Sequence, residues 1–493
     1  MLFFIAVTAL FLDFTGTIHS VLGWTAKLQF LPALLALNLG IVIALVLLTL
    51  LAGRVYCSVI CPLGVMQDII SHISGMRKKK RFRFSYSREI KWLRYGILGL
   101  FVVALVAGIG SFVALLAPYS SYGRIVSNLL APIYGWGNNL LAWLAERAGS
   151  YAFYEKEVWI KSIPTFAIAA VSFIVIAILA WRGGRTYCNT VCPVGTLLGV
   201  LSRYSVLRPV IDTGRCKDCS LCARSCKSSC IDFKNHSIDY SRCVACMDCL
   251  YNCSHGAISM RCRLNKSAAQ PDSVRHEPSE TGSVDSGRRG FLSVSAMVAA
   301  SSIIKAEEKK VDGGLAVIED KKAPVRANPI VPAGAGGLRN FAQHCTACQL
   351  CVSVCPNNVL RPSTDLTRLM QPEMSYETGY CRPECTRCSD VCPAGAIRPV
   401  STEEKSSIRI GHAIWVKKNC IPLSDGVECG NCARHCPSGA IQMVPSDAAN
   451  PESLKIPVVN TERCIGCGAC ENLCPARPFS AIYVEGHSSH SIM

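Results

Sequence analysis

Hydrophobic residues are concentrated in the first 200 positions of the chain, where they form long stretches. Residues 31–51, 92–116 and 163–181 each approach the ~20 apolar residues that a helix needs to cross a bilayer. Residues 1–15 are also apolar, but they are few and include Asp13, so we count them as a fourth, shorter helix. The pattern predicts an all-α transmembrane bundle of about four helices.

The apolar stretch at residues 125–144 has a different character. Pro132, Gly135 and Gly137 interrupt it, and proline both removes a backbone donor and breaks the interior of a helix. We therefore expect interfacial or re-entrant structure here instead of a plain span.

Basic residues give the predicted bundle an orientation. Residues 77–91, which are rich in Lys and Arg, follow the second predicted helix, and Arg182, Arg185, Arg203 and Arg208 follow the fourth. Because positive loops stay in the cytoplasm, both should be cytoplasmic. The net charge of +17 would also suit nucleic acid, but the densest basic run lies between two hydrophobic segments. We interpret it as a topology signal and expect no nucleic-acid partner.

Residues 264–289 have the polar, aromatic-free composition of a flexible linker. Arg288 and Arg289 follow at its end, before an apolar run that reaches Ile304. This layout is typical of a twin-arginine export signal, and it would equally suit a fifth membrane anchor. Both alternatives place the C-terminal part outside the cytoplasm. A surface helix that leaves the C-terminal part in the cytoplasm is the third alternative.

One motif occurs twice in the predicted membrane part. A Gly-Arg-x-Tyr-Cys-x3-Cys-Pro-x-Gly sequence begins at Gly53 and again at Gly184, each time directly after a hydrophobic helix. Two helix pairs related by pseudo-symmetry would bring the four cysteines together near the cytoplasmic face. They are Cys57, Cys61, Cys188 and Cys192. They could hold a cofactor, as a further cluster, or remain thiols or disulfides with a structural role.

Most of the 30 cysteines occur in runs of four with gaps of two or three residues. Three cysteines of such a run wrap one [4Fe-4S] cluster, and in two-cluster ferredoxins the fourth serves the neighbouring cluster. Two runs predict a two-cluster module: Cys216, Cys219, Cys222, Cys226 and Cys243, Cys246, Cys249, Cys253. Four more runs predict a four-cluster domain: Cys345, Cys348, Cys351, Cys355; Cys381, Cys385, Cys388, Cys392; Cys420, Cys429, Cys432, Cys436; and Cys464, Cys467, Cys470, Cys474.

Zinc and disulfides are the alternatives for these runs. Repetition of the run, a proline after its last cysteine in all four C-terminal runs and the near absence of histidine favour iron–sulfur clusters. Six clusters leave only Cys230 and Cys262 unassigned beside the paired motifs, and we interpret both as unligated thiols. In the C-terminal domain the spacing leaves two orders open for the fourth ligands, exchange between neighbouring runs and a nested exchange, the first run with the last and the second with the third; of the two we favour the nested order.

These features predict a multidomain chain with four parts. Residues 1–205 form the transmembrane bundle, and residues 206–263 form an α+β two-cluster ferredoxin module. Residues 264–310 form the linker with its anchor-like segment. Residues 311–493 form an α+β ferredoxin-like domain with four clusters.

The motifs resemble those of known families. The first 263 residues resemble NapH-type membrane polyferredoxins, with the NosR and CcoG groups as relatives, through the paired Tyr-Cys-x3-Cys-Pro-x-Gly motifs and the first ferredoxin module. From Arg288 onward the chain resembles the NapG/MauM ferredoxin-type proteins, including the eight residues between Cys420 and Cys429. The resemblance implies a quinol dehydrogenase of the bacterial inner membrane. Its six or seven clusters would carry electrons from the quinone pool to a periplasmic redox protein or reductase.

A quinol site needs an ionisable group that accepts protons within the membrane. Asp13 and His19 lie at the outer end of the first predicted helix, and we take them as candidate catalytic residues. A competing hypothesis is an assembly factor for a respiratory enzyme, whose Cys-x3-Cys-Pro thiols would handle copper. A reductase with a substrate pocket of its own is disfavoured, because the chain lacks a Gly-rich dinucleotide loop and a haem motif.

Overall fold

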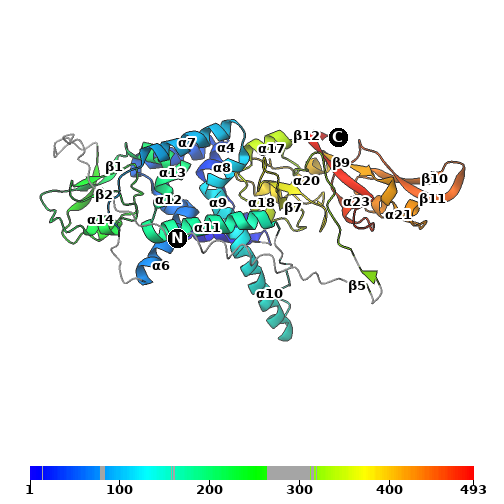
Figure 1. The fold of residues 1–493 in the computed structure, drawn as a ribbon, viewed down its shortest axis with the longest axis horizontal. Helices are drawn as coiled ribbons and strands as arrows, with labels where there is room; N and C mark the ends of the chain where they lie inside the picture. Colours follow the sequence, from blue (N-terminus) through cyan, green and yellow to red (C-terminus); the bar gives the residue numbers. More distant parts are fainter. Residues whose placement is uncertain are drawn as a thin grey trace, which may run out of the picture.

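The computed structural model describes residues 1–13, 15–77, 84–156, 158, 161–263, 311–312, 316–317 and 319–493. The molecule is elongated, with a helical domain in the middle and a cysteine-rich domain at each end (Figure 1). The predicted linker, the segment with Arg288 and Arg289, and residues 78–83 of the basic run lie outside the described residues. The choice between export signal and membrane anchor therefore stays open.

Helices build the whole middle domain, beginning at the N-terminus. They are α1 (Leu2–Leu12), α2 (Thr17–Leu22), α3 (Trp24–Lys27), α4 (Phe30–Leu35), α5 (Leu39–Ala52), α6 (Pro62–Arg77), α7 (Lys91–Val106), α8 (Gly110–Leu116), α9 (Pro118–Ile125), α10 (Ala131–Arg147), α11 (Ile163–Gly183), α12 (Thr186–Thr190) and α13 (Pro193–Ser202), with two π-helical turns, η1 (Tyr56–Ile60) and η2 (Val126–Leu130).

Two of the three long predicted spans are each broken into two helices. Between α4 and α5 the chain turns through Leu37, which has a φ of 52°, and the Asn38 side chain then caps α5 by accepting a hydrogen bond from the Ile41 amide. Between α7 and α8 it turns at Gly108, where φ is 75°. Among the described residues only α11 is long and apolar enough to cross a membrane by itself. A bundle of four uninterrupted spanning helices is therefore not supported.

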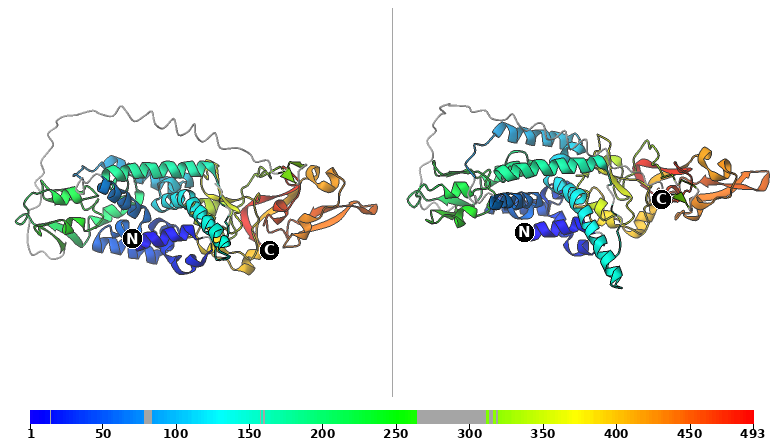
Figure 2. Two further views of the ribbon diagram at one scale, coloured as in Figure 1. Left: turned by 90° about the horizontal axis from the view of Figure 1, so that it is seen from below. Right: turned by 60° about the horizontal axis from the view of Figure 1, so that its bottom comes forward.

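The segment that carries Pro132 forms one continuous helix, α10, so the re-entrant alternative is not formed and the interfacial alternative stays a prediction. Proline is tolerated in the first turn of a helix, where its missing N–H has no partner to lose, and Pro132 lies there. Helix α10 projects from the body at a steep angle to α11 (Figures 1 and 2). It is therefore not a re-entrant loop.

The first cysteine-rich domain is a small α+β unit. Strands β1 (Leu207–Ile211) and β4 (Ile258–Cys262) pair antiparallel, as do β2 (Ile231–Asp232) and β3 (Ser237–Ile238). Two short helices, α14 (Leu221–Ser225) and α15 (Asp248–Tyr251), lie between them in the chain. The chain enters and leaves this domain along one two-stranded sheet.

The C-terminal domain combines short helices with antiparallel strand pairs, β7 with β8, β9 with β12 and β10 with β11. Its strands are β7 (Leu360–Pro362), β8 (Pro372–Met374), β9 (Ile408–Trp415), β10 (Ile441–Asp447), β11 (Asn450–Val459) and β12 (Ile482–Ile492), and the two-residue strands β5 (Val311–Asp312) and β6 (Ala316–Val317) precede them. Its helices are α17 (Leu338–His344), α18 (Leu350–Ser353), α19 (Arg387–Asp390), α20 (Thr402–Ser407), η4 (Lys417–Asn419), α21 (Ile421–Ser424), α22 (Asn431–Arg434) and α23 (Ala469–Asn472).

Both cysteine-rich domains pack directly against the helical domain. Val244 of the first and Leu350 of the second belong to the hydrophobic core of the helices. Gly123 of α9 lies so close to the Cys348 carbonyl and the Phe11 ring that a side chain at this position would collide with both. The three domains therefore form one continuous body.

Candidate iron–sulfur sites

Backbone conformation prepares the cysteine loops for a negatively charged cluster. In four of the runs, the second and the fourth residue after the first cysteine have positive φ. These residues are Asp218 and Ser220, Ala245 and Met247, Ala347 and Gln349, and Gly466 and Gly468. Such turns direct successive backbone N–H groups into one concavity, which suits an anion. The amides of Ala257, Ala347 and Ala481 already donate to cysteine sulfurs at 3.3–3.4 Å, as the amides around iron–sulfur clusters do.

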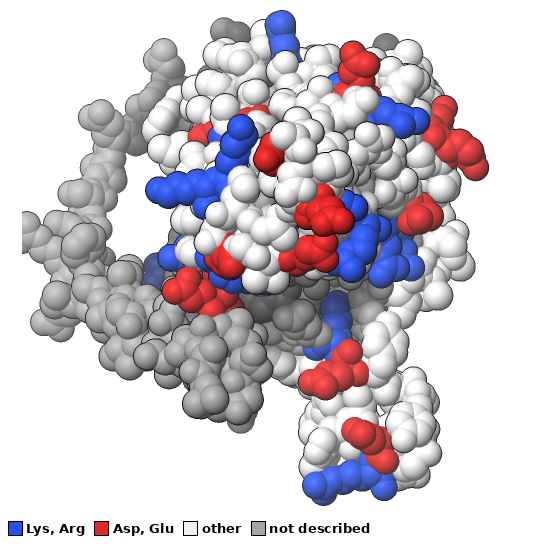
Figure 3. Space-filling model, turned by 90° about the vertical axis from the view of Figure 1, so that its right-hand side faces the viewer, with Lys and Arg blue, Asp and Glu red and all other residues white. Residues whose placement is uncertain are grey.

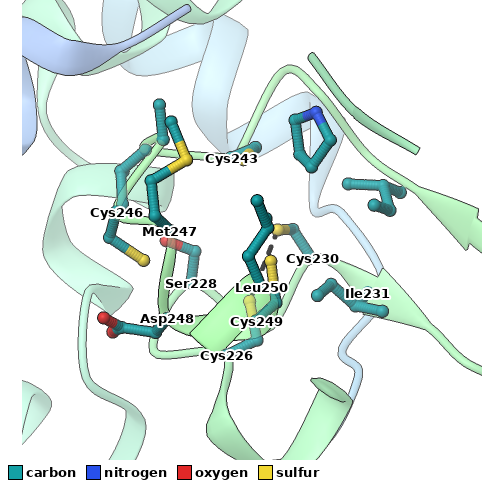
Figure 4. Close-up of a pocket in the computed structure, with 14 residues that line it drawn as sticks. Cys226, Ser228, Cys230, Ile231, Cys243, Cys246, Met247, Asp248, Cys249 and Leu250 are labelled. Carbon is teal, nitrogen blue, oxygen red and sulfur yellow. Dashed lines mark hydrogen bonds between the residues drawn. The ribbon is translucent and has the colours of Figure 1, made fainter. Parts of the chain in front are cut away.

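In the first cysteine-rich domain the two runs exchange their fourth cysteines. Site 1 joins Cys216, Cys219 and Cys222 to Cys253, which line one pocket. Site 2 joins Cys243, Cys246 and Cys249 to Cys226, which line another. Figure 4 shows the side chains of site 2 around their pocket, on both sides of a short strand. This is the arrangement expected of a two-cluster ferredoxin.

Cys230 is a fifth cysteine at site 2 that the run spacing does not reveal. It is buried, and its Sγ lies 3.5 Å from the Sγ of Cys226 (Figure 4). A hydrogen bond from the Cys230 thiol lowers the pKa of Cys226 to about 7, although burial opposes the shift. Cys262, by contrast, lies in β4 and pairs across the sheet with Leu207.

The C-terminal runs also exchange their fourth cysteines, but between neighbours. Cys345, Cys348, Cys351 and Cys392 lie close enough to one another that their charges would raise each other's pKa, and they form site 4; Cys381, Cys385, Cys388 and Cys355 form site 5 on the same ground. In the same way Cys464, Cys467, Cys470 and Cys436 form site 6, and Cys420, Cys429, Cys432 and Cys474 form site 7.

The nested exchange expected from the sequence is therefore wrong. The runs that begin at Cys345 and Cys381 form one pair, and the runs that begin at Cys420 and Cys464 form another. The two pairs meet at sites 5 and 6, where the amide of Cys381 donates to the carbonyl of Cys467 at 3.0 Å.

Site 3 brings together the two Cys-x3-Cys-Pro motifs beyond the ends of α5 and α11. Cys57, Cys61, Cys188 and Cys192 are all buried, and Cys61 interacts with both Cys188 and Cys57. Burial raises the pKa of Cys61 to about 12 and that of Cys188 in the same direction. Burial raises the pKa of Cys192 as well, so these three side chains favour the thiol form until a metal displaces their protons.

Each of the two motifs contributes an arginine that donates a hydrogen bond to the backbone of the other motif. The Arg54 guanidinium donates to the Cys188 carbonyl at 3.2 Å, and Arg185 donates to the Cys57 carbonyl in return. Gly64 and Gly195 leave the space for these guanidinium groups, since a Cβ at either position would collide with the arginine of the other motif. The pseudo-symmetry inferred from the repeat is thus built from reciprocal hydrogen bonds.

The two arginines differ in their counter-charge. Arg185 forms an ion pair with Asp68 at 2.6 Å, whereas Arg54, which is also fully buried, has no carboxylate partner among the described residues. Its other partners are the Asn189 amide oxygen and the Ser241 carbonyl, at 2.9 and 3.1 Å. Because a buried cation needs a counter-ion, four metal-bound thiolates beside Arg54 fit this charge.

Asp13 and His19 come together at the other end of the helical domain. His19 Nδ1 lies 3.3 Å from Asp13 Oδ2, and both side chains are buried. Burial raises the pKa of Asp13, but hydrogen bonds from Thr15, Gly16 and His19 outweigh it and hold the pKa below its usual value. The pair lies next to the C-terminal domain, because Gly16 approaches the guanidinium of Arg387.

Comparison with known families agrees with these sites. The family described as a 4Fe-4S binding domain matches residues 34–81 and 165–211, which contain the two halves of site 3. The family described as a 4Fe-4S dicluster domain matches residues 344–411 and 427–477. The first match of the dicluster family contains both the run that begins at Cys345 and the run that begins at Cys381. This agrees with an exchange of fourth cysteines between neighbouring runs. No solved structure matches the chain.

Individual relatives cover parts of the chain. The methylamine utilization ferredoxin-type protein MauM of Methylobacillus flagellatus is 31% identical over 169 residues, which is 33% of this chain and 70% of MauM. The chain belongs to the ferredoxin-type 4Fe-4S proteins. The ferredoxin-type protein NapF of Escherichia coli is 29% identical over 164 residues, 33% of this chain and 89% of NapF. The ferredoxin-type protein MauN of Methylobacillus flagellatus is 25% identical over 226 residues, 44% of this chain and 65% of MauN.

This ferredoxin-type protein is thus an iron–sulfur electron-transfer protein. The predicted resemblance to MauM is confirmed, whereas the resemblance to the NapH, NosR and CcoG groups stays a prediction. The comparisons also leave the number of clusters and the roles of Asp13 and His19 as predictions.

Proposed function

We propose that this ferredoxin-type protein is a membrane-bound electron conduit that oxidises quinol and passes electrons to a redox partner outside the cytoplasm. The observation that carries the proposal is the order of the seven cysteine sites. The elements beside them, α14, α12, α18, α23 and α21, follow one another along the long axis of the molecule, with the helical domain between the two cysteine-rich domains (Figure 1).

The first half of the row runs from site 1 to site 3. Cys249 of site 2 interacts with Cys222 of site 1. Arg54 then joins sites 2 and 3, because it lies 3.8 Å from the Cys57 sulfur and interacts with Cys243. The buried Arg54 guanidinium therefore lies near the cysteines of both sites.

Buried aromatic side chains fill the space between sites 3 and 4. Tyr56 interacts with Cys57 and Cys61, and Tyr119 of α9 interacts with Tyr56 on one side and with Cys348 of site 4 on the other. Both tyrosines are fully buried. The row therefore continues through the helical domain along packed protein.

The second half of the row lies in the C-terminal domain. Cys351 of site 4 interacts with Cys388 of site 5, and Cys467 of site 6 interacts with Cys381 of site 5. Site 7 shares its two cysteine runs with site 6. Each [4Fe-4S] cluster carries one electron at a time, so a row of them serves as a path for single electrons.

Exposed apolar side chains on the outside of the helices support a membrane location. On α5, Leu39, Ile43, Leu47 and Leu51 form one stripe at four-residue spacing, and each is more than half exposed. On α11, Val171, Ile174, Val175 and Ile178 form another, and only 22% of the most apolar window of this helix is buried. A core helix of a soluble protein would be mostly buried, and such stripes favour contact with lipid.

Helix α10 supports the same placement. It carries exposed Trp136 and Trp143, and the Arg147 guanidinium lies 3.8 Å from the centre of the Trp143 ring. Tryptophan and arginine side chains are typical of the boundary between lipid and water. In the proposed orientation α11 crosses the bilayer and α10 lies near its outer surface.

The C-terminal end is the natural place for a redox partner, because the row of sites ends there. Acidic and basic side chains alternate over this end of the molecule and do not form a field of one sign (Figure 3). Such a surface suits a protein partner with complementary charge and disfavours nucleic acid.

The competing hypothesis, an assembly factor that handles copper, needs accessible thiols. Exchange of a thiol-bound metal requires an attacking ligand to reach the sulfur. The cysteines of site 3 are deeply buried, and two arginines hold their motifs together through backbone carbonyls, so this geometry favours a resident metal group.

The test uses the full-length protein, purified without air and placed in lipid nanodiscs. Seven [4Fe-4S] clusters would give about 28 irons per chain, and six would give about 24. Addition of a short-chain quinol should bleach the visible absorption of the clusters and produce the EPR signals of reduced clusters. Zinc in place of iron would end the conduit proposal, and clusters that dithionite reduces but quinol does not would end its quinol part.

A further inference from the structure

A cavity of about 620 Å³ lies where the helical domain meets the C-terminal domain. Its walls come from the end of α1, from η2 and α10, from the segment before α11, and from the loops around α18. This volume is in the range of sites for small organic ligands, which are commonly 300–1,000 Å³. Neither the cysteine sites nor the Asp13–His19 pair explains the cavity.

Two polar atoms in the wall, Gln349 Nε2 and Ser127 Oγ, have no hydrogen-bond partner among the residues that the structure describes. Gln349 is only 2% exposed, and its Nε2 makes no hydrogen bond, while its Oε1 accepts one from Asn128 at 2.8 Å. The Oγ of Ser127 is buried and also makes none. Because a buried polar group without a partner costs roughly 1–3 kcal/mol, a ligand that accepts or donates at these atoms would remove the cost.

Part of the wall fits a flat apolar ring, and another part is charged, through Glu155, Lys156, Lys161 and Arg387. Phe11, Phe166 and Pro132 supply apolar surface. Ser127 belongs to the π-helical turn η2, and such turns are frequent at functional sites. A ring that carries oxygen atoms would place its faces against the apolar wall and its oxygens toward Ser127 and Gln349.

The surroundings of the cavity suit an electron donor. Cys355 of site 5 lines it directly. Thr15 lines it as well, and the Thr15 hydroxyl donates to Asp13 at 2.8 Å. The cavity therefore lies between a cysteine of the electron path and the buried Asp13–His19 pair.

We propose that this cavity binds the ring of a quinone or quinol, with Ser127 and Gln349 as hydrogen-bonding partners of the ring oxygens. The inference rests on the proposed quinol oxidation and adds the place and the residues. It makes Asp13 and His19 neighbours of the bound ring instead of its direct partners, since neither lines the cavity.

Binding is measured directly, without turnover. Full-length protein in nanodiscs is titrated with a radiolabelled short-chain quinone, and a photoreactive azidoquinone is cross-linked in parallel and mapped by mass spectrometry. For the double variant Ser127→Ala/Gln349→Ala we expect the Kd to rise about tenfold, because each lost hydrogen bond is worth a few-fold in affinity. The cross-links should fall on residues of η2, α10 and the α18 loop.

The matched control is Ser120→Ala. Ser120 is a buried serine whose hydroxyl also lacks a partner, but it lies in α9 and does not line the cavity. Its variant should bind quinone like the wild type. Iron content and the visible spectrum verify that each variant is folded, and the single variant Ser127→Ala, expected to lose about threefold, serves if the double variant does not fold.

The outcomes separate this inference from the proposed function. Quinone that binds in the cavity without quinol reducing the clusters would leave the site standing and overturn quinol oxidation. Clusters that quinol reduces while the Kd of the double variant stays within twofold of the wild type, or cross-links elsewhere, would overturn the cavity assignment alone.

Discussion

Sites 2 and 3 lie next to each other but are built in different ways. Site 2 is made by two nearby loops whose backbone turns aim amides at the cysteines. Site 3 also receives an amide hydrogen bond, from Gly195 to the Cys192 sulfur at 3.3 Å, but it depends on two motifs far apart in the chain that Arg54 and Arg185 hold together. A ferredoxin loop thus carries most of its own site, whereas site 3 exists only when the helical domain is assembled.

Removing cysteines from each site is expected to have the largest effect, because it tests whether sites 2 and 3 hold their clusters independently. We expect Cys188→Ser/Cys192→Ser to lower the iron content by about four per chain while sites 1, 2 and 4 to 7 keep their clusters. Quinol should then still reduce clusters in the C-terminal domain, but electrons should no longer pass between the two cysteine-rich domains. Metal analysis and EPR of each cluster type measure both effects.

The corresponding change at site 2, Cys246→Ser, is the control. It should remove or convert one cluster and leave site 3 loaded. Equal iron in the Cys188→Ser/Cys192→Ser variant and the wild type would contradict a cluster at site 3.

The second prediction concerns the stability of site 3. Arg185→Leu leaves Asp68 with Lys227 as its remaining ion-pair partner, at 2.9 Å, and removes the hydrogen bond to the other motif. We expect a loss of about 3 kcal/mol in the free energy of unfolding, since breaking a buried ion pair is costly. Denaturation in mild detergent, followed by helix content, measures the loss.

Arg182→Leu serves as the control for this variant. Arg182 is exposed and lies near the end of α11, only three residues earlier in the chain. A stability loss as large as that of Arg185→Leu would show that the effect comes from the helix end and not from the ion pair.

Local sequence predicts much of this architecture. The predictions that failed concern features that depend on contacts between segments far apart in the chain. Cysteine spacing gave the runs and the repeat gave the partners of site 3, because both signals lie within a few residues. The break after Leu35 rests on Leu37 with positive φ and the Asn38 cap. The break at Gly108 lies where α8 docks on Gln371 of the C-terminal domain. Neighbour exchange and the place of Cys230 also depend on contacts between distant segments, which spacing does not encode.

The third prediction addresses the uncompensated charge of Arg54. Loss of a nearby cation disfavours the more negative, reduced state of a cluster. We expect Arg54→Gln to lower the reduction potential of the cluster in site 2 or site 3 by on the order of 50–100 mV, which corresponds to a charge about 8 Å away at an effective dielectric constant of ~20. Redox titration followed by EPR measures the shift.

Arg54→Lys separates charge from packing. It keeps the cation while losing the fork of hydrogen bonds, and it should restore most of the potential. A potential that is as low with lysine as with glutamine would attribute the shift to altered geometry.

The smallest expected effect concerns Cys230, which lies outside the two cysteine runs but contacts Cys226 of site 2. When Cys226 is a thiolate, the Cys230 thiol at 3.5 Å is the hydrogen-bond donor, and a hydrogen bond to a cluster sulfur stabilises the reduced state. Cys230→Ala should therefore keep the iron content and lower the potential of site 2 by about 20–60 mV, the one-electron equivalent of a 0.5–1.5 kcal/mol hydrogen bond. Cys262→Ala, in the β4 strand of the same domain, should leave the potential unchanged. If Cys230→Ala instead removed a cluster, Cys230 would be a ligand, and the assignment of Cys226 as the fourth ligand of site 2 would be wrong.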